Sequence, residues 1–221
     1  MKNNLLITDT ETGGYDETKN PITQITMEVL DPNTFQTLHY FETFVKPYNN
    51  LTITPEALTA SRVTMQQINN GIDVKLLMKG IFEVFKKANK SGKASTNPYF
   101  VGHNFGFDMR FLKYLFVYMK QDLFQWVQEV PFDTLAMMKL QEGDTLKASE
   151  NQKYTLIACC ERMGITLKNA HGSGADVAAT KQLFTKLVNQ QRNGSNQDVS
   201  ATNVRATNRE STARNNYFFE F

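Results

Sequence analysis

The sequence predicts an α/β protein whose sheet contains strands of mixed direction and is flanked by helices. Three short segments rich in β-branched and aromatic residues come first, and helical segments then alternate with further strands. Hydrophobic residues make up 41% of the 221 residues, which is enough for one domain with a buried core. The net charge of +2 neither requires nor excludes a polyanionic partner.

The first three strands are expected to form an antiparallel start to the sheet. Residues 5–7 are a short apolar run that ends in acidic residues, which indicates a buried strand. Residues 24–30 and 38–45 have the composition of strands, and Asp31-Pro32-Asn33 between them is a turn signal. The second and third strands are therefore expected to pair as neighbours.

Three helices are expected after this start. Thr54-Pro55-Glu56 opens the first of them, with Thr54 as its N-cap and Pro55 at its first position. A second helix is predicted over residues 64–69. A third is predicted over residues 74–87, where apolar residues recur every four positions on one face.

The second half of the chain continues the alternation of helices and strands. Residues 88–98 are polar and contain Gly, Ser, Asn and Pro, which predicts a surface loop. A strand over 99–101 and a helix over 107–120 follow, and two more helices are predicted over 155–163 and 176–188. We expect the parallel part of the sheet to come from this half.

The two cysteines and the lack of long apolar runs suggest where the protein works. Cys159 and Cys160 are adjacent and fit neither a disulfide framework nor a metal-binding pair, so we expect them in a buried helix. The N-terminus does not resemble a signal peptide, and no stretch approaches the roughly 20 apolar residues that a membrane span needs. We therefore expect a soluble, cytoplasmic protein without membrane contact.

The composition changes after about residue 189. Polar residues dominate from there to Asn216, and such a segment cannot bury enough surface to offset its ordering entropy. We therefore expect a domain over residues 1–188 and a disordered tail over 189–221. The chain finishes with the aromatic motif Tyr217-Phe218-Phe219-Glu220-Phe221, which we interpret as a partner-binding motif, with folding back onto the domain as the alternative.

Three acidic residues follow two of the predicted strands, the first strand and the strand over 99–101. Asp9 and Glu11 alternate along their strand, so their side chains point the same way and repel each other unless a cation lies between them. Asp108 is expected in the first turn of the helix after residues 99–101, where the helix dipole favours the ionised carboxylate. Each of these features is ordinary when it occurs alone.

A histidine and a further acid lie near the start of the last predicted helix. His171 and Asp176 are separated by Gly172-Ser173-Gly174-Ala175, and the two glycines predict a flexible loop. Such a loop would allow His171 to reach over a site that contains Asp176. With an ordinary pKa of about 6.5, a histidine can deprotonate a water molecule near neutral pH.

The four acids are informative as a set because all of them fall at strand ends or helix starts, where an α/β sheet gathers functional groups. Carboxylates without thiolates suit hard cations such as Mg²⁺ or Mn²⁺. Two such ions about 3.5–4 Å apart can stabilise both the attacking and the leaving oxygen of a phosphoryl displacement. The set therefore predicts phosphodiester chemistry at a metal site.

At these positions the chain resembles the DEDDh 3′→5′ exonucleases, the group that includes the epsilon proofreading subunit of bacterial replicative polymerases. The three motifs appear in order as Ile-Thr-Asp-Thr-Glu-Thr-Gly-Gly at 7–14, Val-Gly-His-Asn-Phe-Gly-Phe-Asp at 101–108 and His-Gly-Ser-Gly-Ala-Asp at 171–176. The resemblance covers about residues 1–188. It implies a ribonuclease-H-like fold, in which three antiparallel strands precede the parallel ones.

The resemblance also implies roles for particular residues. It assigns two Mg²⁺ or Mn²⁺ ions to Asp9, Glu11, Asp108 and Asp176, and it makes His171 the general base. It places Thr10 and Thr12 against the terminal nucleotide, with Leu58 and Phe107 packing on its base or sugar.

Three further positions are candidates for substrate binding. Asn104 is interpreted as a helix N-cap whose amide could also reach a substrate, and His103 as a residue that organises the turn beside it. Arg62 stands where many relatives have glycine. It could contact a phosphate, or it could be a solvated turn residue.

These features predict a 3′→5′ exonuclease that releases nucleoside 5′-monophosphates from single-stranded or frayed DNA, as a proofreading or repair nuclease. The alternative within this class is an exoribonuclease that trims RNA ends or short oligonucleotides. A third hypothesis is a catalytically idle adaptor that acts through its tail. The expected tail partner is a replication or repair protein, such as a sliding clamp, a polymerase subunit or a single-strand-binding protein.

Overall fold

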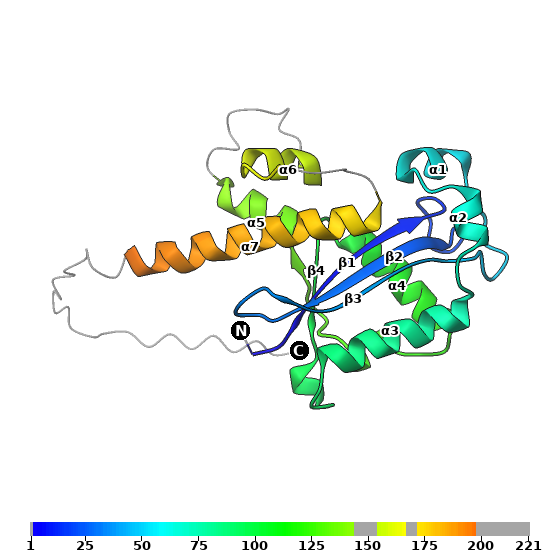
Figure 1. Cartoon of the computed structure of the whole chain (residues 1–221), viewed down its shortest axis with the longest axis horizontal. Coiled ribbons are helices and arrows are strands. Elements are labelled where there is room, and N and C mark those ends of the chain that lie inside the picture. The colour runs from blue at the N-terminus through cyan, green and yellow to red at the C-terminus, as the bar shows by residue number, and fades with distance from the viewer. Residues whose placement is uncertain (1, 144–153, 167–171, 198–221) are drawn as a thin grey trace, which may run out of the picture. The chain divides into compact units, whose positions relative to one another are not determined.

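The computed structural model describes residues 2–143, 154–166 and 172–197. It contains a mixed sheet of five strands in the order β3-β2-β1-β4-β5 (Figure 1). The strands are β1 (Leu5–Thr12), β2 (Ile22–Leu30), β3 (Thr37–Phe44), β4 (Tyr99–Gly102) and β5 (Phe132–Asp133). β1, β2 and β3 pair antiparallel, whereas β4 is parallel to both β1 and β5. The predicted fold class is therefore confirmed.

The helices begin close to where the sequence predicts them. They are α1 (Pro55–Ser61), α2 (Met65–Asn69), α3 (Val74–Ala88), α4 (Gly106–Tyr118), α5 (Thr134–Gln141), α6 (Leu156–Arg162) and α7 (Ser173–Gln197). Thr54 is the N-cap of α1, as predicted, and its hydroxyl accepts a hydrogen bond from the Ala57 amide at 3.2 Å. β5 and α5 were not predicted.

The last helix is longer than predicted. Contacts within the chain divide it between Val188 and Asn189, but α7 continues to Gln197. The helix therefore extends over residues 189–197, within the segment that was predicted to be disordered. The rest of the predicted tail, including its aromatic motif, lies outside the described residues.

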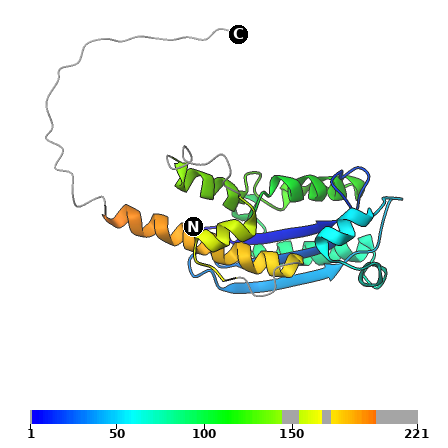
Figure 2. The same cartoon turned by 90° about the horizontal axis from the view of Figure 1, so that it is seen from above.

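Alternating side chains of β1 supply both hydrophobic cores. Leu6 faces the larger core, which contains Ile81 and Phe85 of α3 and Leu112 of α4. Leu5 and Ile7 face the opposite way, toward Phe184 and other apolar residues of α7. Figure 1 shows α3 and α7 on opposite sides of the strands, and Figure 2 shows from above that β1 runs between α4 in green and α7 in yellow and orange.

A third cluster joins α5, α6 and α7. Cys159 and Cys160 on α6 are free cysteines, fully buried against Leu183 and Leu187 of α7, so the prediction that they lie in a buried helix is confirmed. Among the described residues, no helix combines the length and the apolar content needed to cross a bilayer.

β1 and β4 separate at the end that carries the acids. Their pairing runs from Leu5 and Tyr99 to Ile7 and Val101. β1 then continues to Thr12 along β2 alone, while the chain leaves β4 at Gly102 and turns into α4. Diverging carboxyl ends of parallel strands form a crevice in α/β sheets, and they commonly hold the functional site.

Arg62, which stands where the family resemblance leads us to expect glycine, has a conformation that suits glycine. α1 ends at Arg62, whose backbone is left-handed, with φ of 59° and ψ of 15°. Glycine adopts this helix-ending conformation without steric cost, whereas a side chain makes it unfavourable by about 1 kcal/mol. Arg62 therefore keeps the turn but strains it.

We expect Arg62→Gly to raise the free energy of unfolding by about 0.5–1 kcal/mol, because relief of the left-handed strain exceeds the extra entropy of glycine in the unfolded chain. Urea denaturation in EDTA measures this. Arg62→Ala is the matched control, which removes the side chain but keeps the strain and should change stability little. A less stable Arg62→Gly protein would show that contacts of the arginine side chain outweigh the strain.

Candidate active site

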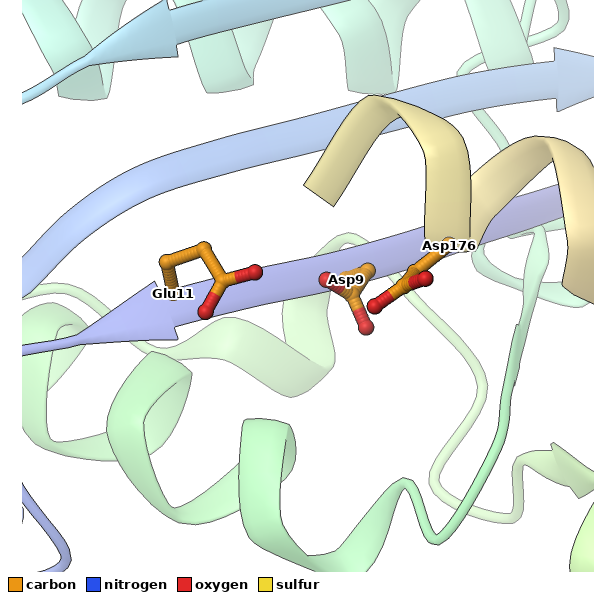
Figure 3. A group of neighbouring side chains, drawn as sticks. All are labelled: Asp9, Glu11 and Asp176. Atoms are coloured by element: carbon orange, nitrogen blue, oxygen red, sulfur yellow. The ribbon is translucent and has the colours of Figure 1, made fainter. Parts of the chain in front are cut away.

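Three acids meet where α7 begins over the end of β1. Asp9 and Glu11 continue the face of β1 that carries Leu5 and Ile7, which is the face that α7 covers. Asp176 lies in the first turn of α7. Carboxylate oxygens of Asp9, Glu11 and Asp176 lie within 4.8 Å of one another, and Figure 3 shows the three side chains converging.

The fourth acid, Asp108, is buried in the first turn of α4 and is bonded to β1. Its Oδ1 accepts hydrogen bonds from the Thr10 amide at 2.8 Å and from the Thr10 hydroxyl at 2.7 Å. The Thr10 amide lies beyond the last residue of β1 that pairs with β4. Asp108 therefore accepts the hydrogen bond from the Thr10 amide that a neighbouring strand would otherwise accept.

Burial and neighbouring charges in this pocket raise the pKa values of Asp9 and Glu11. Burial, followed by repulsion from Asp108, Asp176 and Glu11, raises the pKa of Asp9 well above its usual value. The pKa of Glu11 rises to about 7 by burial and by the charges of Asp176 and Asp108.

Burial also raises the pKa of Asp108 to about 7, although the hydrogen bonds from Thr10 act in the opposite direction. The start of the helix favours the ionised carboxylate, as expected, but the loss of hydration on burial is the larger effect. Oxygen donors with raised pKa values fit a hard divalent cation, whose charge would replace the protons.

A cavity of about 240 Å³ opens beside the acids. Its walls come from the end of β1, the loop after it, α1, the start of α4 and the start of α7, and comprise Thr10, Glu11, Thr12, Gly14, Tyr15, Ala57, Ala60, Ser61, Phe107, Gly172 and Asp176. The Thr54 amide donates to the Gly13 carbonyl at 2.8 Å, which holds the start of α1 against the end of β1. The cavity is therefore built from segments that β1 brings together.

Most of the predicted nucleotide contacts line this cavity. Thr10, Thr12 and Phe107 are among its walls. Leu58 was also predicted, but the described lining from α1 consists of Ala57, Ala60 and Ser61. Leu58 is not among these lining residues, and its contact with the nucleotide stays a prediction.

His103 is held in the turn before α4 by protein partners. The His103 Nδ1 atom lies 2.9 Å from the Thr134 hydroxyl, and Nε2 lies 2.8 Å from the Tyr154 carbonyl oxygen. Protein partners therefore occupy both ring nitrogens, which agrees with organisation of the turn rather than with substrate binding. Burial lowers the pKa of His103.

Asn104 is not the N-cap of α4. That position belongs to Phe105, and Asn104 precedes it with a left-handed backbone, φ 57°. The amides of Asn104 and Phe105 instead donate to the carboxylate of Asp133 at 2.9 and 3.0 Å. Sequence analysis missed Asp133, because an acid 28 residues away has no local capping signal.

The glycines near Asp176 have different functions, and His171 lies outside the described residues. Gly172 has a φ of 109°, which favours glycine. Gly174 already belongs to α7, and a Cβ atom there would lie 2.9 Å from a carboxylate oxygen of Glu42. The interpretation of Gly174 as a flexible loop residue is therefore wrong, because the position lies within α7.

Tyr15 is a cavity residue that the motifs did not reveal. Its side chain is 81% exposed, and its ring meets that of Phe107 edge to face, with the centroids 6.3 Å apart. An exposed aromatic residue directly after Gly13-Gly14 was the available signal. Arg62, by contrast, lines an adjoining cavity of about 280 Å³, which shares Ser61 and Gly172 with the first.

Comparison with known proteins agrees with this geometry. Ribonuclease T of Buchnera aphidicola subsp. Baizongia pistaciae is 26% identical over 190 residues, which cover 83% of each chain. Ribonuclease T of Haemophilus influenzae is 25% identical over 199 residues, covering 83% of this chain and 79% of the relative.

Solved structures show the same fold. E. coli Exonuclease I in complex with a dT13 oligonucleotide superposes with a TM-score of 0.71 at 21% identity, over 88% of this chain but only 43% of Exonuclease I. Cell-death related nuclease 4 superposes with a TM-score of 0.68 at 16% identity, over 85% of this chain and 64% of that one. The family model for RNase T, described as exonuclease, matches residues 6–184. The chain therefore belongs to the RNase T exonuclease family and is a hydrolytic 3′→5′ exonuclease of the DEDDh type.

Proposed function

We propose that two divalent ions, Mg²⁺ or Mn²⁺, serve this enzyme and that it releases nucleoside 5′-monophosphates from a single-stranded 3′ end. The observation that carries the proposal is a set of buried carboxylates, in which Asp9, Glu11 and Asp176 place oxygens within 4.8 Å of one another and burial raises the pKa values of Asp9, Glu11 and Asp108. These carboxylates would hold the ions. When bound, such ions stabilise the charge that develops on the attacking and leaving oxygens.

Two further residues have proposed roles, Thr10 from its hydrogen bonds and His171 from the sequence motif that contains it. Thr10 orients Asp108 through its two hydrogen bonds. His171 is proposed as the base that accepts a proton from the attacking water. The idle-adaptor hypothesis has no support, because the chain belongs to a family of hydrolytic enzymes.

The cavity beside the acids would receive the terminal nucleotide. Thr10 and Thr12 line it next to Glu11, and the rings of Phe107 and Tyr15 offer surfaces on which a base could stack. Arg62 lines the adjoining cavity and is proposed to contact a phosphate of the same strand.

The relatives change the order of the two substrate hypotheses. The sequence motifs favoured DNA, but the curated relatives named Ribonuclease T match this chain over about four-fifths of their own length, at 83% and 79%. We therefore propose RNA 3′ ends as the first candidate substrate. Single-stranded DNA is the second candidate, because Exonuclease I of the same fold was solved with dT13.

Proofreading and the partner of the aromatic motif remain predictions. A proofreading role would require a polymerase as a separate chain. Exonuclease I, which shares this fold with a TM-score of 0.70, has been solved as a complex named ExoI/SSB-Ct. That complex is a reason to test a single-strand-binding protein first.

We expect Asp9→Asn to lower the rate of hydrolysis at least about a hundredfold, because several kcal/mol of transition-state charge stabilisation depend on the bound metal. The rate is measured on a short labelled oligonucleotide with Mn²⁺, and again with EDTA, which should abolish it. Glu56→Gln is the control, since this acid is exposed on α1 and is not part of the cavity lining. Near-normal turnover by Asp9→Asn would refute the metal assignment.

The same variant should be more stable than the wild type when metal is removed. The raised pKa of Asp9 makes its charge unfavourable in the folded state, a cost that is absent at low pH and grows as the pH rises through the folded pKa. In EDTA, Asp9→Asn should therefore raise the melting temperature at pH 8 and change it little near pH 4. A lower melting temperature at pH 8 would mean that the carboxylate has a stabilising partner.

The substrate proposals are separated by matched oligonucleotides. We expect stepwise shortening of single-stranded RNA from its 3′ end, with slower shortening of the same sequence as DNA, because the full-length relatives are ribonucleases. A closed circular strand should resist cleavage. Equal or faster hydrolysis of DNA would reverse the substrate order, and linearisation of the circle would indicate an endonuclease instead.

A further inference from the structure

The turn that leads into α4 lacks a local explanation for its shape. It spans residues 102–105 and directly precedes Phe107 and Asp108, two residues of the site. Its N-cap residue is Phe105, whose side chain has no oxygen to accept a hydrogen bond. Asn104 beside it has a left-handed backbone, which costs about 1 kcal/mol for a residue other than glycine. Contacts from outside the turn must therefore hold it in this conformation.

Asp133 supplies the missing acceptors from the neighbouring strand. The parallel pairing of β4 with β5 sets Gly102 opposite Asp133. Asp133 Oδ1 accepts from the Asn104 amide at 2.9 Å, and Oδ2 accepts from the Phe105 amide at 3.0 Å. Oδ1 also accepts from the Leu135 amide at 2.9 Å, which makes Asp133 the N-cap of α5. One carboxylate thus ties the start of α4 to the start of α5.

Thr134 extends this attachment to the first half of the turn. Its side chain is fully buried, and its hydroxyl lies 3.0 Å from the Gly102 carbonyl oxygen and 2.9 Å from His103 Nδ1. Asp133 and Thr134 together therefore contact all four residues of the turn. Charge-assisted hydrogen bonds such as those of Asp133 are roughly twice as strong as neutral ones.

The position of this turn controls how Asp108 meets β1. Both bonds from Asp108 to Thr10 are short, at 2.8 and 2.7 Å, so they tolerate little movement of α4. Phe107, which lines the cavity, moves with the same turn. Displacements of about 1 Å in the groups that support a site are enough to impair catalysis.

We propose that Asp133 is a positioning residue, which holds the turn at 102–105 and thereby sets Asp108 against Thr10. Asp133 does so without itself contacting metal or substrate. The consequence for catalysis rests on the proposed role of Asp108 as a metal ligand, whereas the consequence for the Asp108–Thr10 bonds does not.

The test uses Asp133→Asn. Asparagine caps a helix as well as aspartate does, so α5 should keep its cap. Its amide group, however, offers N–H where the Phe105 amide needs an acceptor, so the turn should lose that bond. The matched control is Asp73→Asn at the N-cap of α3, where the carboxylate accepts from the Lys75 and Leu76 amides at 2.8 and 3.0 Å.

Hydrogen exchange of the metal-free protein tests the positioning role directly. We expect Asp133→Asn to accelerate exchange of the Thr10 amide, which donates to Asp108, while amides in the β1–β2 ladder stay protected. Asp73→Asn should leave the Thr10 amide unchanged. If Asp133→Asn fails to fold, Asp133→Ser is measured instead, since serine also caps a helix but is too short to span both amides.

A metal titration then tests the consequence for catalysis. We expect the Mn²⁺ concentration that gives half-maximal hydrolysis to rise about 10–100-fold in Asp133→Asn, the usual effect of losing a residue that orients a metal ligand. Unchanged exchange at Thr10 would overturn the positioning role. Faster exchange with unchanged metal activation would support the positioning role and contradict the assignment of Asp108 as a metal ligand.

Discussion

Repulsion among carboxylates at the end of β1 is the constraint on which the rest of the site depends. Asp9, Glu11 and Asp176 place oxygens within 4.8 Å of one another, and burial raises the pKa values of Asp9, Glu11 and Asp108. Such a cluster is unfavourable unless protons or cations neutralise it. The site therefore requires positive charge, and we propose that a divalent ion supplies it.

The fold maintains this cluster by attaching α7 and α4 firmly to the sheet. The hydroxyls of Thr26 on β2 and Ser173 in α7 are both buried and lie 2.7 Å apart. Lys181, two turns along α7, pairs with Glu28 of β2 at 2.7 Å. α4 is held by Asp108 on Thr10 and by Asp133 on the turn before it. These hydrogen bonds and the ion pair thus hold the helices in place against the repulsion among the carboxylates of the site.

Sequence reasoning predicted most elements because their periodicity and caps are local, as with Thr54 and α1. It missed β5, since a strand of two residues has no periodicity, and with it Asp133. The error at Asn104 has the same origin, because a tertiary acceptor replaced the local cap. Arg62 could be singled out as a departure from its relatives, but only the backbone shows that its conformation is the one glycine favours.

The central claim is that a cation replaces protons on these acids, and proton release on metal binding tests it most directly. Mn²⁺ binding is measured by calorimetry near pH 6.5 in two buffers that differ in ionisation enthalpy. With pKa values of about 7 for Glu11 and Asp108 and a raised pKa for Asp9, the account predicts net proton release at this pH, which decreases as the pH rises. Binding without proton release at pH 6.5, or the lack of any binding at pH 8, would contradict it.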